Sequence, residues 1–175
     1  MENKRILLDT NIYGYIIMNE NVVEIVELVK QREDILIYGS DIIRKELRAT
    51  PKEIKIENRK LRIALLDLYD TLISNHYLLV TDKVIKIAND YYEVYYTLGG
   101  RLPKKSIIND LIIVSVASYR DISIVVSNDN KTMLSELNLK SYEIVNKLNN
   151  LNIPEFINYD KFKRWLVWEI VLMLW

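Results

Sequence analysis

Two short apolar runs constrain the fold of this chain more than any other feature, because each ends abruptly in polar residues that include an acid. Ile6–Leu8 is followed directly by Asp9, and Ile122–Val126 is followed by Ser127-Asn-Asp129. Such runs are typical of strands buried in a parallel sheet, whose ligands bind beyond the carboxyl ends of the strands. The pattern predicts that Asp9 and Asp129 lie at one shared edge of a sheet.

The rest of the chain alternates between short apolar runs and segments with helical periodicity, which predicts an α/β fold with a central, mostly parallel sheet of four or five strands flanked by helices. Further strands are expected at 35–38, 77–80 and 141–145, helices at 10–18, 20–30, 41–50, 53–73, 83–98, 107–119, 131–137 and 159–175, and a turn at 146–152. We expect residues 1–150 to form the main domain. Residues 151–175 are expected to be a helical tail packed on that domain or at an interface, within a single domain overall.

Composition limits the kind of metal site that the chain can form. There is no cysteine and only one histidine, His76, so any metal must be a hard ion held by carboxylates, meaning Mg²⁺ or Mn²⁺. No secretion signal pattern is present at the N-terminus, so we expect a cytoplasmic protein. The apolar stretch Trp165–Trp175 is shorter than the roughly 20 residues that a membrane span needs, and it is expected to pack into the core, a dimer interface or a partner's groove.

Two further acids occupy helix faces that should be apolar. Glu46 lies between the apolar residues of its predicted helix, and Asp110 shares a face with Ile107 and Val114. An ionised carboxylate on a buried face costs several kcal/mol unless it is paired or binds a metal. If these two acids converge with those after the strands, a divalent cation would relieve their repulsion and could support phosphodiester hydrolysis. The alternative for Asp9 is a simple helix cap.

These motifs together resemble the PIN-domain nucleases, as in VapC-type toxin ribonucleases. The resemblance rests on Leu7-Leu-Asp-Thr-Asn11, on Glu46 in the helix after the second strand, on Asp110 in an apolar helix and on Ser127-Asn-Asp129, and it covers roughly residues 6–137. It implies a PIN-like sandwich. The stretch Asn130–Met133 departs from the family pattern because it lacks an aromatic residue.

The resemblance also implies a function and assigns roles to residues. It implies a Mg²⁺- or Mn²⁺-dependent endoribonuclease that acts on RNA, forms a homodimer and, as a toxin, pairs with a small antitoxin protein. By similarity the metal-binding and catalytic acids would be Asp9, Glu46, Asp110 and Asp129, with Asn11 and Ser127 as residues that orient them. The alternative is a catalytically inactive PIN-like scaffold that binds RNA or protein. Phosphoryl transfer through Asp9 fits less well, because Asn11 occupies the position where such phosphatases carry a second Asp.

Basic and aromatic residues suggest where RNA could bind, although the formal net charge is zero. The candidate RNA-binding residues are Arg44, Arg48, Arg101, Lys104 and Lys105, and the alternative for each is a solvated helix face. The tyrosines at 91, 92, 95 and 96 could stack on bases, but their helical spacing favours packing against a neighbouring helix or subunit.

Overall fold

The computed structural model describes residues 3–173, with side chains described for residues 3–167. Its elements in chain order are β1 (Lys4–Leu8), α1 (Thr10–Asn19), α2 (Val22–Lys30), β2 (Ile35–Ser40), α3 (Asp41–Ala49), β3 (Lys55–Ile56), β4 (Arg59–Lys60), α4 (Leu61–Ile73), β5 (Tyr77–Leu78), α5 (Asp82–Thr97), α6 (Lys104–Tyr119), β6 (Ile124–Val126), α7 (Glu136–Asn149), β7 (Glu155–Ile157) and α8 (Tyr159–Met173).

The main sheet has five strands in the order β5-β2-β1-β6-β7, and every neighbouring pair is parallel. The predicted α/β class and the strand number are therefore confirmed. The chain first builds outward from β1 to β2 and β5, and then returns to the other side of β1 to form β6 and β7. The strand order thus reverses between β1 and β6, and such a switch point is where open α/β sheets bind ligands.

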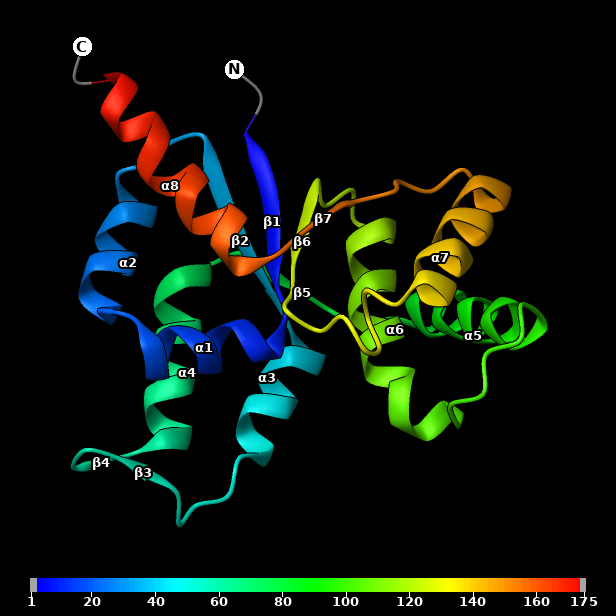
Figure 1. The fold of residues 1–175 in the computed structure, drawn as a ribbon, viewed down its shortest axis with the longest axis horizontal. Helices are drawn as coiled ribbons and strands as arrows, with labels where there is room; N and C mark the ends of the chain where they lie inside the picture. The colour runs from blue at the N-terminus through cyan, green and yellow to red at the C-terminus, as the bar shows by residue number, and fades with distance from the viewer. Residues whose placement is uncertain (1–2, 174–175) are drawn as a thin grey trace.

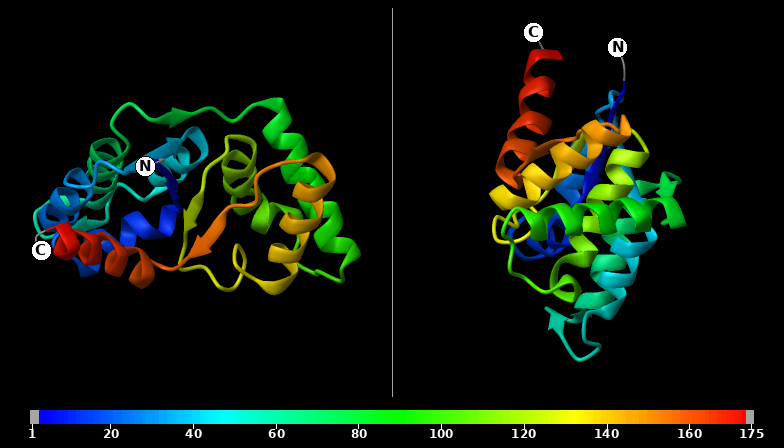
Figure 2. Two further views of the ribbon diagram at one scale, coloured as in Figure 1. Left: turned by 90° about the horizontal axis from the view of Figure 1, so that it is seen from above. Right: turned by 90° about the vertical axis from the view of Figure 1, so that its right-hand side faces the viewer.

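Helices cover both faces of this sheet. Figure 1 shows α1, α2, α4 and α8 gathered on one side and α5, α6 and α7 on the other, and the view from above in Figure 2 shows the same separation. The strands are apolar because both of their faces are covered, and Ile6, Leu7 and Leu8 of β1 are fully buried. Burial of β1 fixes its register beside β6, with Leu8 opposite Val126.

The predicted helix at 53–73 is wrong in its first part, because α4 begins only at Leu61. Residues before it form the antiparallel hairpin of β3 and β4, which turns at Glu57, where φ is 51°. The Leu61 N–H donates to the Ile54 carbonyl at 2.9 Å and closes the hairpin against the start of the helix. Ile54 and Ile56 are the only apolar residues of this segment, too few to form a helical stripe that packs on the core.

The predicted helix at 131–137 and strand at 141–145 are also wrong, since residues 131–134 form a turn and one helix, α7, begins at Glu136 and continues through the predicted strand. The turn expected at 146–152 consequently starts later, and Asn150 ends the helix in the left-handed conformation with φ 51°. The buried face of α7 repeats at helical spacing but is largely polar, which concealed its period in the sequence: Asn138, Ser141, Tyr142, Val145 and Asn146.

The segment after α7 contacts the sheet through β7 and the loop between α2 and β2 through α8. β7, which was not predicted, pairs with β6, and its residue Ile157 accepts the backbone N–H of Ser127 at 3.0 Å. In α8 the Trp165 carbonyl accepts a hydrogen bond from the fully buried Arg32, whose guanidinium also lies over the Trp165 ring. Trp165 packs against the core, and the packing of the rest of the tail stays a prediction, because the side chains from Trp168 onward lie outside the described residues. No helix within residues 3–173 is long and apolar enough to cross a membrane.

Candidate functional site

Asp9 is held at the end of β1 by hydrogen bonds from three residues. It is only 4% exposed. Its Oδ1 accepts from the Thr10 N–H at 2.6 Å, and its Oδ2 accepts from Asn11 Nδ2 at 2.6 Å and from the Ser127 hydroxyl at 2.7 Å. The bond to Thr10 makes Asp9 the N-cap of α1, as the simpler interpretation expected. The bond from Ser127 joins it to the segment after β6, so capping accounts for only part of its environment.

Ser127 and Asn11 link the ends of β1 and β6. The Ser127 hydroxyl oxygen accepts from Asn11 Nδ2 at 3.2 Å and from the Asp129 N–H at 3.0 Å. Asn11 Oδ1 in turn accepts the Asn128 N–H at 3.3 Å. The parallel register of the two strands places these groups side by side, as predicted for the shared edge of the sheet.

Glu46, which lies in α3, is half-buried and is held by two residues that sequence reasoning missed. The Thr10 hydroxyl donates to Oε2, and Asn109 Nδ2 donates to Oε1 at 2.7 Å. Thr10 belongs to α1 and Asn109 to α6, so three helices meet at this one carboxylate. Its partners are far away in the sequence, and no local pattern of residues indicates them.

Asp110, in α6, is joined to Asp129 through Thr132, which sequence reasoning also missed. Oδ2 of Asp110 lies 2.5 Å from the Thr132 hydroxyl oxygen, which also contacts Oδ2 of Asp129. Oδ1 of Asp129 accepts the backbone N–H groups of Lys131 and Thr132 at 2.8 and 2.9 Å. Within residues 3–173, Oδ1 of Asp110 accepts no hydrogen bond and therefore keeps its acceptor capacity.

The acids influence one another's ionisation. Burial, followed by the nearby charges of Asp110 and Glu46, raises the pKa of Asp9 to about 7 against the opposing effect of its hydrogen bonds. Burial and the charges of Asp129 and Glu46 likewise raise the pKa of Asp110 to about 6. Burial also acts to raise the pKa of Asp129, but hydrogen bonds from the Thr132 hydroxyl and from backbone N–H groups outweigh it, and the pKa lies below its usual value. Burial and mutual repulsion therefore disfavour the charged forms of Asp9 and Asp110.

The donor chemistry suits a hard divalent cation, although the acids are not clustered tightly. Among the described residues, no group of three or more Asp, Glu, His or Cys side chains is placed to hold one metal ion. Mg²⁺ needs fewer protein ligands than that, because it keeps several waters and is commonly bound through one or two carboxylates together with phosphate. The acids at this edge fit such a site through carboxylate pairs.

The predicted basic residues differ in their availability. Arg44 has a structural role, since its guanidinium forms a two-point ion pair with Asp70 and lies over the Tyr69 ring. The side chains of Arg48, Arg101 and Lys105 are exposed. Lys104 is half-buried with Nζ 5.3 Å from the centre of the Tyr92 ring, and both lysines lie in the first turn of α6, the helix that carries Asp110.

The tyrosines of α5 confirm the predicted packing role. Tyr91 is fully buried, and its hydroxyl bridges Asn146 at 2.6 Å and Ser118 at 3.1 Å. Tyr95 is also buried, whereas Tyr96 is exposed. Tyr91 therefore joins α5 to α6 and α7, and neither of the two buried tyrosines is accessible for stacking on bases.

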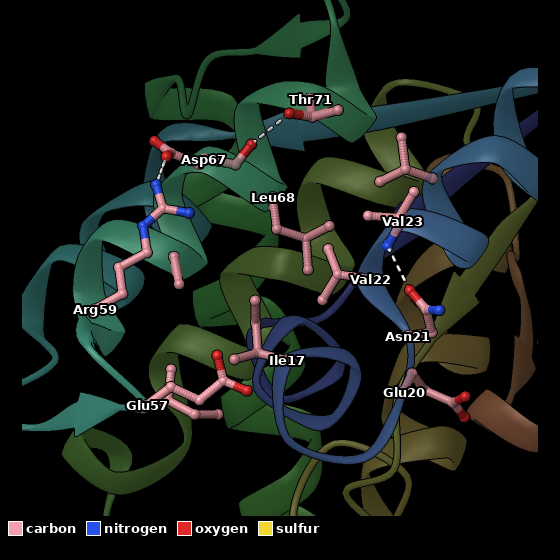
Figure 3. Close-up of a pocket in the computed structure, with 13 residues that line it drawn as sticks. Ile17, Glu20, Asn21, Val22, Val23, Glu57, Arg59, Asp67, Leu68 and Thr71 are labelled. Atoms are coloured by element: carbon pink, nitrogen blue, oxygen red, sulfur yellow. Dashed lines mark hydrogen bonds and ion pairs between the residues drawn. The ribbon is translucent and has the colours of Figure 1, made fainter.

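A separate pocket of about 480 Å³ lies between α1, α2, the β3–β4 hairpin and α4 (Figure 3). Ile17, Val22, Val23 and Leu68 contribute apolar surface, and the Arg59–Asp67 ion pair lies at its rim in Figure 3. None of the four acids lines this pocket. The acid-lined edge and the pocket are thus two distinct features of the molecule.

The sheet, its switch point and the acids beside it define an α/β protein with an acidic site at the carboxyl edge of a parallel sheet. A comparison with protein-family models matches the PIN domain over residues 6–138. The chain therefore belongs to the PIN domain family, and the predicted resemblance is confirmed. No match was found among curated proteins.

Solved structures similar to this chain share its fold at low sequence identity. VapBC2 from Rickettsia felis, bound to a promoter DNA fragment, has a TM-score of 0.55 at 17% identity over 88% of this chain and 98% of its own. VapBC-1 from nontypeable Haemophilus influenzae has a TM-score of 0.54 at 15% identity over 89% and 98%. FitAcB from Neisseria gonorrhoeae has a TM-score of 0.52 at 20% identity over 74% and 91%. At these identities the similarity establishes the fold alone.

Proposed function

We propose that this protein is a divalent-metal-dependent endoribonuclease that hydrolyses RNA phosphodiester bonds, and that it is the toxin of a type II toxin–antitoxin pair. The observation that carries the proposal is the electrostatic coupling of Asp9, Glu46, Asp110 and Asp129 at the carboxyl edge of the sheet. Membership of the PIN domain family supports nuclease activity, and the similarity to VapBC structures supports the toxin assignment.

We propose that Mg²⁺ or Mn²⁺ is held by pairs of carboxylates among these four acids. A bound cation of this kind makes water more acidic and offsets negative charge on the attacked phosphate. The chain's own contribution is to fix the carboxylates: Ser127 and Asn11 orient Asp9, and Thr10 and Asn109 orient Glu46. Groups fixed before substrate arrives need no reorganisation during the reaction.

Basic residues of α3, of the loop before α6 and of the first turn of α6 would contact the RNA backbone. The proposed contacts are Arg48, Arg101, Lys104 and Lys105. Arg44 has a structural role instead, because it forms an ion pair with Asp70. The β3–β4 hairpin contributes a further basic element, since Lys55 lies directly opposite Lys60 across its two strands. Two like charges in this position destabilise a hairpin, and an RNA phosphate would relieve their repulsion.

The proposed protein partners are a small antitoxin and a second copy of this chain. The similarity to the VapBC2 and FitAB structures supports an antitoxin partner here. The pocket of Figure 3 offers exposed apolar surface at Val23, away from the acids, for side chains of such a protein. The homodimer is a prediction from the family resemblance, and the mass of the purified protein in solution tests it.

Purified protein tests the proposed activity directly. We expect cleavage of a fluorogenic RNA in the presence of Mn²⁺ that is abolished by EDTA and reduced by about 100-fold or more in Asp110→Asn, which removes one carboxylate charge. Asp121→Asn is the matched control, because Asp121 is an exposed acid outside the site. Wild-type cleavage rates in a folded Asp110→Asn variant would refute the site.

The second candidate is a PIN-like scaffold that binds RNA or protein without cutting. One observation favours it: no group of three acids among the described residues is placed to hold a single ion. A scaffold of this type is expected to bind RNA without cleaving it and to show no increase in melting temperature when Mn²⁺ is added. The nuclease is expected to be stabilised by Mn²⁺, because the cation offsets the mutual repulsion of the acids.

A further inference from the structure

Thr132 occupies a central place among the acids although it carries no charge. Its hydroxyl oxygen lies 2.5 Å from Oδ2 of Asp110 and also contacts Oδ2 of Asp129. Asp110 belongs to α6, and Asp129 belongs to the turn that follows β6. Thr132 is therefore the point at which a helix and a loop are connected beside the switch point of the sheet.

The backbone around Thr132 is itself fixed. Its N–H donates to Oδ1 of Asp129 at 2.9 Å, and its carbonyl accepts a hydrogen bond of 2.7 Å from Nδ2 of Asn138. Asn138 is fully buried in α7, and so is the neighbouring side chain of Met133 in the core. The position of the Thr132 hydroxyl is consequently determined by the turn on one side and by α7 on the other.

This placement has a specific effect on Asp110. A threonine hydroxyl carries one proton and two lone pairs, so it donates to only one of the two carboxylates at a time, and its contact with Asp110 involves only one of that carboxylate's two oxygens. The contacted atom is Oδ2, whereas Oδ1 accepts no hydrogen bond from residues 3–173. Fixing Oδ2 restricts rotation of the carboxylate and sets the direction in which Oδ1 can accept a ligand.

We propose that Thr132 is a positioning residue of the acidic site. Its hydroxyl holds the carboxylates of Asp110 and Asp129 in one arrangement and thereby orients the available oxygen of Asp110 toward a divalent cation. That a cation binds here rests on the proposed metal-dependent function. The orientation of the carboxylates rests on the hydrogen bonds within the chain. Groups that orient metal ligands in this way change metal affinity or activity by about 10- to 100-fold when they are removed.

The experiment compares Thr132→Val, which keeps the shape and removes the hydroxyl, with Thr132→Ser, which keeps the hydroxyl. Thr97→Val is the matched control, because the Thr97 hydroxyl donates only to the Glu93 carbonyl on an exposed face of α5. Mn²⁺ binding to the full chain is measured by electron paramagnetic resonance, without RNA, alongside cleavage as a function of Mn²⁺ concentration. We expect about a 10-fold or greater loss of Mn²⁺ affinity in Thr132→Val, recovery in Thr132→Ser and no change in Thr97→Val.

A metal-free measurement separates this proposal from the proposed function. The side-chain carboxyl ¹³C signals of Asp110 and Asp129 are expected to move in Thr132→Val and to stay in place in Thr97→Val. Unchanged signals together with wild-type Mn²⁺ affinity in Thr132→Val would overturn the role of Thr132 while leaving the nuclease intact. A wild-type protein that neither binds Mn²⁺ nor cuts RNA would overturn the proposed function, and the carboxyl signals would then decide alone whether Thr132 couples the two acids.

Discussion

The burial of Asp9 makes the stability of the metal-free protein depend on pH in a direction that can be tested. Its pKa is about 7 in the folded protein, compared with the ordinary value of 3.8 expected for an unfolded chain. Between those values the folded state binds more protons than the unfolded state, so the free energy of unfolding should fall as pH rises from about 4 to about 7. At about 1.4 kcal/mol per pH unit, the total loss from Asp9 is about 4 kcal/mol.

The substitution Asp9→Asn removes this dependence because the amide does not ionise. It also removes a hydrogen-bond acceptor for Asn11 and Ser127, and an unmade buried hydrogen bond costs about 1–3 kcal/mol at every pH. The variant should therefore be less stable than the wild type at pH 4 and more stable at pH 8. The difference between the two proteins should change by about 4 kcal/mol over this range.

Urea unfolding in EDTA at several pH values measures the difference. Asp121→Asn serves as the matched control, because it makes the same chemical change at an exposed position. A stability difference between wild type and Asp9→Asn that stays constant from pH 4 to pH 8 would refute the assigned environment of Asp9. Adding Mn²⁺ at pH 8 should stabilise the wild type more than the variant, because only the wild type keeps the charge that the cation offsets.

Three further predictions concern arginines. Arg48→Ala should weaken RNA binding and reduce the slope of log affinity against log salt by about 0.7, the value for one phosphate contact to a single strand. Arg44→Ala should instead lower the melting temperature, because it breaks the ion pair with Asp70. If Arg44→Ala weakened RNA binding and Arg48→Ala lowered the melting temperature, the roles assigned to the two arginines would be reversed. Arg32→Ala should lower the free energy of unfolding by about 3 kcal/mol in urea titrations, since it removes a buried guanidinium bonded to Asp34 and to the Trp165 carbonyl. A loss below about 1 kcal/mol would contradict that role.

The parts of the fold that could be predicted are those in which apolar residues alone fill the buried face. β1 and β6 are of this kind, and their pairing places Asp9 beside Ser127. Helix α7 could not be predicted, because its buried face is filled by amides and hydroxyls such as Asn138, whose partners lie elsewhere in the chain. β7 is short and has only Ile157 buried, so its sequence has no distinctive period.

The same distinction holds for the candidate site. The four acids could be proposed because a carboxylate on an apolar face, or directly after a buried strand, is unusual enough to be noticed in a sequence. Thr10, Asn109 and Thr132 could not, because threonine and asparagine are ordinary residues at helix ends and turns. Their importance comes from contacts with residues 22 to 63 positions away, which only the folded chain brings together.

The connection between the end of β6 and the start of α8 bears on when the site can form during synthesis. The Ser127 N–H requires the Ile157 carbonyl, and Oδ1 of Asn128 accepts the Tyr159 N–H at 2.9 Å. Those partners are translated about 30 residues after the segment that they hold, while domains fold largely as units as the chain emerges. A nascent chain that has not yet reached residue 159 contains all four acids but lacks the support for the segment leading to Asp129. We therefore expect the segment leading to Asp129 to become fixed only after the start of α8 has emerged.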